Sequence, residues 1–177
     1  QRQGVIIMEL YEAIKKRYSV RSYQDKPIEQ EKLDRIFEAV RQAPSASNRQ
    51  PWKFIIVRDA ATRKKLVSVC NDQAFVSQAA LVIAGVGLAP ERRMACGVPS
   101  DPVDLGIAME HIALAAVAEG LGTCWIGSFN QDRIHELLGI PAEATVVEVM
   151  TLGYPAGEPR YRDRKGLDEI FCYEKFQ

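Results

Sequence analysis

The sequence lacks the features that mark several classes of protein. Its four cysteines, Cys70, Cys96, Cys124 and Cys172, lie far apart and form no CxxC pair. A disulfide framework needs an oxidising compartment, which nothing in the sequence indicates, so reduced thiols in a cytoplasmic protein are the favoured interpretation. No apolar run approaches the roughly 20 residues of a membrane-spanning helix, and the apolar stretch at residues 4–8 is shorter than a signal-peptide core.

An excess of charge is also missing. Lys plus Arg number 23 and Asp plus Glu number 23, so the formal net charge is zero. A neutral chain has no general attraction for nucleic acid or an anionic membrane, and we predict neither as a partner. Any anion site must come from basic residues placed locally. Histidine is scarce: His111 and His135 have no partner at metal-ligand spacing, so we predict no metal site and interpret His111 as a hydrogen-bonded interior residue.

What is present indicates an ordinary globular chain. Apolar residues make up 47% and charged residues 26% of 177 residues, enough for a core without disulfides. We predict one domain over residues 8–177. Residues 1–7 are interpreted as an N-terminal extension or a remnant of an expression tag, with Met8 as the natural start.

Hydrophobic periodicity predicts helices and short strands in a mixed order. Helices are expected over residues 8–17, 28–43, 60–69 and 103–122, and a short one between Asn130 and Gly139. Strands are expected over residues 53–58, 80–88, 123–129 and 145–155. Residues 89–102 are expected to be irregular. The apolar end of the tail, residues 170–176, has no visible partner in its own chain, and docking on another subunit is as good an interpretation as docking on its own.

Two basic clusters lie near the two ends of the chain. In "RYSVR", Arg17, Ser19 and Arg21 face the same way if the backbone is extended, and two guanidiniums beside a hydroxyl suit a phosphate. The competing interpretation is that these charges are solvated or complement a helix end. The second cluster, residues 160–165, has the same two interpretations. An anion site built from both clusters requires the two chain ends to meet.

Other catalytic motifs are weak or missing. "GVGLAP" at residues 85–90 lacks the third glycine of a dinucleotide fingerprint, and no GxSxG nucleophile motif exists. Cys124 lies inside an expected strand, which favours an inert thiol over a nucleophile. Trp52 and Trp125 are interpreted as packing residues. The loop "PSASNRQPW", residues 44–52, is unexplained by periodicity, charge or metal-ligand spacing, yet it is rich in short hydrogen-bonding side chains.

Several stretches together resemble the nitroreductase family of flavin-dependent reductases. They are "RYSVR", "APSASNRQPW", "DLGIAMEHIALAA", "GLGTCWIG", "LGIP" and "LGYP...RDRKGLDEI", in the family's order and spacing. The resemblance runs from about Met8 to the end of the chain. It implies an α+β fold with a central, mainly antiparallel sheet flanked by helices. It also implies a homodimer that exchanges C-terminal tails and binds FMN at its interface.

The resemblance also assigns cofactor contacts. The first FMN motif is matched by Arg17, Tyr18, Ser19 and Arg21, and the phosphate-binding pair near the tail by Arg162 and Arg164. The segment that the second subunit lays against the flavin is matched by Pro44, Ser45, Ala46, Ser47, Asn48 and Gln50. The strand end whose backbone approaches flavin N5 is matched by Trp125, Ile126 and Gly127.

The chain departs from the family pattern in two places. Asn71 and Gln73 stand where many relatives carry a basic residue, and we include both as contacts to the ribityl or pyrimidine part of FMN. Residues 89–102 replace the helices that larger members insert over the flavin, which implies a more open or partner-built substrate pocket.

The implied activity is reduction of nitroaromatics, quinones or similar electron-poor acceptors with NAD(P)H. The implied mechanism is ping-pong, without a catalytic side chain, because the hard chemistry belongs to the cofactor. Three alternatives stay open: an FMN-binding protein of low turnover, a specialised flavin chemistry such as dehalogenation or flavin destruction, and an interaction module without flavin.

Overall fold

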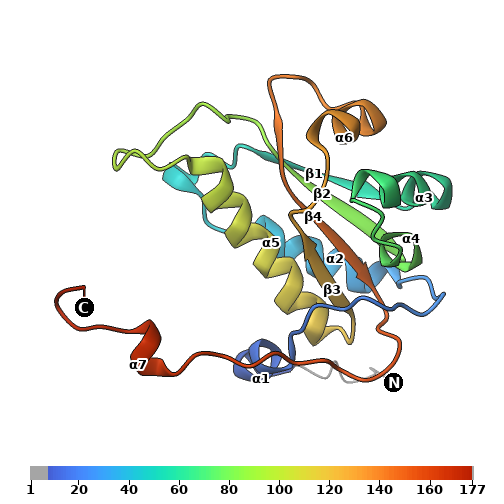
Figure 1. Cartoon of the computed structure of the whole chain (residues 1–177), viewed down its shortest axis with the longest axis horizontal. Helices are drawn as coiled ribbons and strands as arrows, with labels where there is room; N and C mark the ends of the chain where they lie inside the picture. The colour runs from blue at the N-terminus through green and yellow to red at the C-terminus, as the bar shows by residue number, and fades with distance from the viewer. Residues whose placement is uncertain (1–7, 177) are drawn as a thin grey trace.

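The structure, a computed structural model that describes residues 8–176, is built on a four-stranded antiparallel sheet (Figure 1). The strands follow the order β1-β2-β4-β3 and are β1 (Trp52–Val57), β2 (Leu81–Gly87), β3 (Gly122–Ile126) and β4 (Thr145–Gly153). All seven residues of β2 are buried, which explains why its sequence is continuously apolar rather than alternating. The predicted α+β class and antiparallel sheet are confirmed.

Helices cover both faces of the sheet. The helices are α1 (Leu10–Lys16), α2 (Gln30–Arg41), the 3₁₀ turn η1 (Ala46–Asn48), α3 (Ala60–Val69), α4 (Phe75–Gln78), α5 (Ser100–Ala118), α6 (Gln131–Leu138) and α7 (Leu167–Ile170). On one face, α2 and α5 pack against one set of strand side chains; on the other, α3, α4 and α6 pack against the alternate set. Successive side chains of a strand point to opposite faces, so this alternation makes two cores and three layers.

The apolar helix begins earlier than the sequence pattern predicts. We expected it to start at Val103, after an irregular segment, but α5 begins at Ser100 and includes Pro102 in its first turn. Proline is tolerated there because the first N–H groups of a helix have no acceptor within it. The inward residues of α5 are buried, whereas Val103 and Ile107 remain 39% and 37% exposed.

The short helix α6 forms as predicted. The side chain of Asn130 accepts a hydrogen bond from the backbone N–H of Arg133 at 2.9 Å, and Gly139 ends the helix in the left-handed conformation (φ 64°). Both are the expected cap geometries.

The segment after α1 lies beside β3. Ser19 forms a parallel bridge with Thr123, and the Val20 N–H donates to the Thr123 carbonyl at 2.9 Å. A Cβ at Gly122 would lie 2.4 Å from Val20 Cγ2, so only glycine allows this approach. The extended backbone that the basic motif needed is therefore present.

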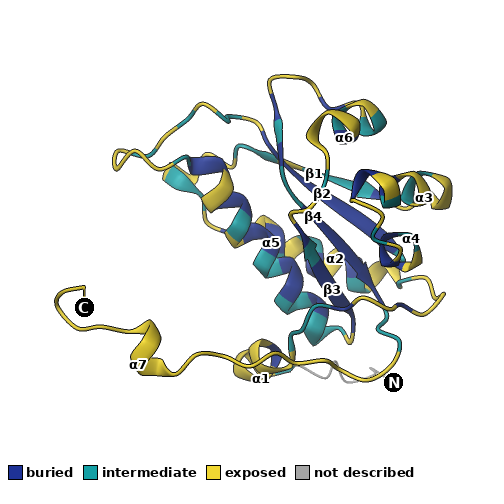
Figure 2. Ribbon diagram, in the orientation of Figure 1, coloured by how far each residue is buried: buried dark blue, intermediate teal, exposed yellow. Residues whose placement is uncertain are grey.

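The C-terminal tail leaves the body of the molecule. Figures 1 and 2 show it running past α1 and then away, coloured as exposed throughout. Its apolar side chains are largely uncovered: Phe171 is 61%, Tyr173 79% and Phe176 96% exposed. Among the helices of residues 8–176, none combines the length and hydropathy needed to cross a bilayer.

Candidate functional site

The two basic clusters line one cleft of about 840 Å³. Its walls come from α1, the segment after it, and the tail, and the lining includes Arg17, Tyr18, Ser19, Arg21, Arg160, Tyr161, Arg162 and Arg164. The rings of Tyr18 and Tyr161 meet edge to face with centroids 5.6 Å apart, which joins the two segments. The chain ends thus meet, as a shared anion site requires.

The arginines of the cleft are weakly engaged by the protein. Arg17 Nε lies 4.0 Å from Glu110 Oε1, and Arg21 lies 6.0 Å from the centroid of the Phe75 ring. Arg164 Nη1 reaches only the carbonyls of residues 162 and 163, at 3.3 and 3.4 Å. Guanidiniums held this loosely can turn their donors toward a bound anion, and a phosphate accepts two such donors at once.

Glu110, which the sequence predictions did not include, pairs with an arginine of the cleft. Burial raises the pKa of its carboxyl, while the Arg17 guanidinium and the Trp125 side chain act in the opposite direction. Its 4.0 Å approach to Arg17 Nε places a carboxylate of α5 next to one arginine of the cleft. The available signal was its presence as a charged residue on an otherwise apolar helix.

The end of β3 is tied to the turn between α3 and α4. Asn71 Nδ2 donates to Ser128 Oγ at 2.8 Å, and Gln73 Nε2 donates to the carbonyls of Cys70 (2.9 Å) and Ser128 (3.3 Å). Next to Ser128, a Cβ at Gly127 would meet nothing within 4 Å. Open space over a glycine backbone suits the close approach of a flat ring.

Loop 44–50 does not contribute to the cleft described above. Among the described residues that line the cleft, none belongs to this loop. It has a defined conformation: Ser45 Oγ accepts the Gln50 N–H at 2.9 Å, and Ala46 N–H donates to Asp104 Oδ1 of α5 at 2.9 Å.

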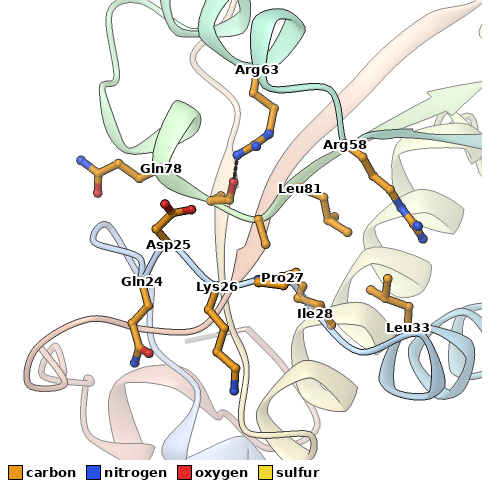
Figure 3. Close-up of a pocket in the computed structure, with 12 residues that line it drawn as sticks. Gln24, Asp25, Lys26, Pro27, Ile28, Leu33, Arg58, Arg63, Gln78 and Leu81 are labelled. Carbon is orange, nitrogen blue, oxygen red and sulfur yellow. Dashed lines mark hydrogen bonds between the residues drawn. The ribbon is translucent and has the colours of Figure 1, made fainter.

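A second hollow, of about 320 Å³, serves as a comparison (Figure 3). Its basic side chains are already engaged by the protein. Arg63 donates to the Ala79 carbonyl, the dashed line in Figure 3, and Arg58 donates to a glutamine of α2 at 3.2 Å. Lys26 lies 3.8 Å from the centroid of the Tyr154 ring. This hollow therefore has fewer basic side chains available to bind an anion than the cleft has.

His111 and Cys124, which we predicted to be non-catalytic, lie in environments typical of structural residues. His111 Nδ1 lies 2.8 Å from the Ala39 carbonyl, as expected for a hydrogen-bonded interior residue. Cys124 is buried in β3, and burial raises the pKa of its thiol, so little reactive thiolate forms at neutral pH. Neither arrangement indicates a catalytic group.

Comparisons with known proteins agree with one another. A sequence model described as the nitroreductase family matches residues 14–100 and 89–154. A protein of Methanothermobacter thermautotrophicus, whose name couples NADH dehydrogenase with NAD(P)H nitroreductase, is 35% identical over 92% of this chain and 86% of its own length. The FMN reductase [NAD(P)H] of Bacillus subtilis is 31% identical over 95% of this chain and 74% of its own.

A solved structure agrees as well. The crystal structure of a nitroreductase family protein from Clostridium novyi NT superposes with a TM-score of 0.78 at 36% identity, over 84% of this chain and 86% of that one.

Proposed function

The chain belongs to the nitroreductase family, and from that premise we propose that it reduces nitroaromatics, quinones or similar electron-poor acceptors by a ping-pong mechanism. The broader activity follows from the family and its named relatives: the chain is an NAD(P)H-dependent flavin oxidoreductase that uses FMN. The acceptor class and the kinetic mechanism are the proposed part.

The cleft built from both chain ends is the observation that carries the proposal. Its residues fit FMN because five arginines line it, and those described above make only weak contacts within the chain. We assign the phosphate to Arg17, Arg21, Arg162 and Arg164, with Tyr18 and Ser19 beside it.

The end of β3 would hold the ring system. Ile126, Gly127 and Trp125 would provide backbone and a packing surface. The amide nitrogens of Asn71 and Gln73 on the adjoining turn already donate within the chain, so we assign their side-chain oxygens to the polar edge of the flavin. When bound, FMN supplies the transfer of two electrons from NAD(P)H to the acceptor. The chain itself binds and orients it, and no side-chain acid or base is assigned.

We further propose that the working unit is a homodimer in which loop 44–50 of one subunit covers the flavin of the other. Two features support this. The tail exposes apolar side chains, and β1 is an edge strand next to an apolar groove lined by Phe37, Val40, Arg41, Trp52, Phe54, Ile56, Ile83 and Ile112. Unpaired edges and exposed apolar segments are commonly covered in the native assembly.

Spectroscopy tests the enzymatic proposal. The purified protein should be yellow, NAD(P)H should bleach the visible flavin band under anaerobic conditions, and a quinone or a nitroaromatic should restore it. For a ping-pong reaction, double-reciprocal plots of initial rate against NAD(P)H concentration, at several fixed acceptor concentrations, should give parallel lines. A yellow protein that NADH and NADPH both fail to bleach would be a passive flavin binder, which contradicts the proposed activity.

A mixed dimer tests the arrangement of the subunits. One chain carries Arg17→Ala and Arg21→Ala, and the other carries Asn48→Ala and Gln50→Ala in the loop. In a mixed dimer one site receives intact arginines from one chain and an intact loop from the other. Half of the sites should therefore regain wild-type affinity for FMN, although neither homodimer does. No recovery would mean that the loop does not act across the interface.

A further inference from the structure

Two buried carboxylates stand near the start of α5. Asp101 is 2% and Asp104 3% exposed. Each accepts the backbone N–H of a different connecting segment: Asp101 Oδ2 from Ala89 and Asp104 Oδ1 from Ala46, both at 2.9 Å. Burying a carboxylate is costly unless hydrogen bonds compensate it, so each of these bonds matters to the segment that it holds.

The segment held by Asp104 is strained. Ser47, Asn48 and Gln50 have φ values of 56°, 52° and 52°, in the left-handed region that residues other than glycine rarely adopt. Such conformations persist only where the surroundings impose them. Hydrogen bonds within the loop shape it, but the bond from Ala46 to Asp104 ties it to the helix.

The second carboxylate oxygen of Asp104 also points to a role in holding loop 44–50. Oδ2 is buried and has no hydrogen-bond partner within residues 8–176. Among the described residues, the hydrogen bond that this carboxylate accepts is therefore the one from Ala46 of loop 44–50. A residue retained at that cost is expected to serve the segment that it touches.

We propose that Asp104 is a positioning residue that holds loop 44–50 in the shape in which it covers the flavin of the partner subunit. This inference rests on the proposed function, because the contact between loop and flavin is itself proposed. A loop already ordered before FMN arrives does not lose conformational freedom on binding, so the affinity for FMN is higher.

The experiment compares Asp104→Ala with the matched control Asp101→Ala in the full-length protein. Both substitutions remove a buried carboxylate from the same end of α5, so both should lower the unfolding midpoint. Asp104→Ala should weaken FMN binding, measured by fluorescence titration, by about 10–100-fold, as expected for one hydrogen bond to a charged group. Asp101→Ala should change it by less than threefold.

Two more variants separate positioning from stability. Asp104→Asn keeps an oxygen that can accept the Ala46 N–H and should restore most of the affinity. Ala46→Pro removes the donor, and the extended Ser45 before it (φ −142°, ψ 161°) is compatible with proline. Combined with Asp104→Ala it should add little, because both substitutions remove the same bond.

The outcomes are distinguishable. Equal effects of Asp104→Ala and Asp101→Ala on FMN affinity, or no effect of either, would overturn the role of Asp104 while the wild type still bound FMN. If Asp104→Ala does not fold, the role of Asp104 is tested by the other two variants. Asp104→Asn should then keep most of the affinity for FMN, and Ala46→Pro should lose it. A wild type that binds no FMN would instead overturn the proposed function.

Discussion

Replacing Arg17 and Arg21 with alanine should empty the flavin site without unfolding the chain. Each guanidinium is expected to make a charge-assisted hydrogen bond to the phosphate, which contributes about 1.5–3 kcal/mol. Together the two account for about 3–6 kcal/mol, which corresponds to about 10²–10⁴-fold in the dissociation constant of FMN. The cleft that they line gives this expectation its structural basis.

The cost to folding should be much smaller. The ion pair of Arg17 with Glu110 is long, at 4.0 Å, and such pairs near the surface contribute about 0–1 kcal/mol. Arg21 lies 6.0 Å from the Phe75 ring, a cation–π contact of about 0.5–1 kcal/mol. The unfolding free energy should therefore fall by no more than about 2 kcal/mol.

The assay is titration of FMN into the apo-protein, followed by flavin fluorescence and by calorimetry, with urea unfolding in parallel. The matched control is Arg58→Ala with Arg133→Ala, which removes two positive charges from a neutral chain in the same way but outside the cleft. Binding of FMN by the Arg17/Arg21 variant within threefold of the wild type would refute the phosphate assignment. An equal loss of FMN affinity in the Arg58/Arg133 control would show that the effect of the Arg17/Arg21 variant comes from net charge in general.

Three further predictions concern folding. Gly122→Ala should destabilise the chain by about 1–3 kcal/mol and also weaken FMN binding, because the added Cβ would lie 2.4 Å from Val20 Cγ2 and push the basic motif away from β3; thermal unfolding and FMN titration check this. Burial raises the pKa of the Glu148 carboxyl above its ordinary value of 4.5, so its contribution to stability is complete below pH 4.5 and is lost as the pH rises through the folded-state pKa. Glu148→Gln should therefore raise the unfolding midpoint at pH 7 but not at pH 4, and a constant difference across that range would contradict this reasoning. Asn130→Ala should lower the unfolding free energy by about 1 kcal/mol in urea, because the N–H of Arg133 loses its cap; an unchanged midpoint would show that the cap contributes nothing.

Local features of the fold were predictable from local sequence. The strand β2 and the helix α3 form where the pattern places them, and Asn130 and Gly139 end α6 as their side-chain and backbone chemistry requires. Helix periodicity, buried-strand composition and caps depend on residues within a few positions of one another. The start of α5 was predicted three residues too late, because residues 89–102, which contain three prolines, were expected to be irregular, although the first turn of a helix accepts Pro102.

The candidate site was predictable in part. For the basic motif after α1 and the cluster in the tail, the residues alone favoured solvated charge, and the resemblance to the family supplied the phosphate role; the fold then placed both on one cleft. Of the polar residues of α5, only His111 was assigned a role from the sequence. In the structure, Asp104 holds Ala46, Glu110 approaches Arg17 and His111 meets a carbonyl of α2.

The sequence by itself determined most of the helices and strands, although not the short helices α4 and α7. It also determined which side chains can bind a phosphate. Both depend on neighbouring residues and on the chemistry of each side chain. Only the tertiary structure decided which of these groups meet. Ala46 and Asp104 are 58 positions apart, and their hydrogen bond exists because the core brings the loop against α5. The left-handed backbone at Ser47 and Gln50 has the same origin, since no local preference selects it and the packed surroundings must hold it.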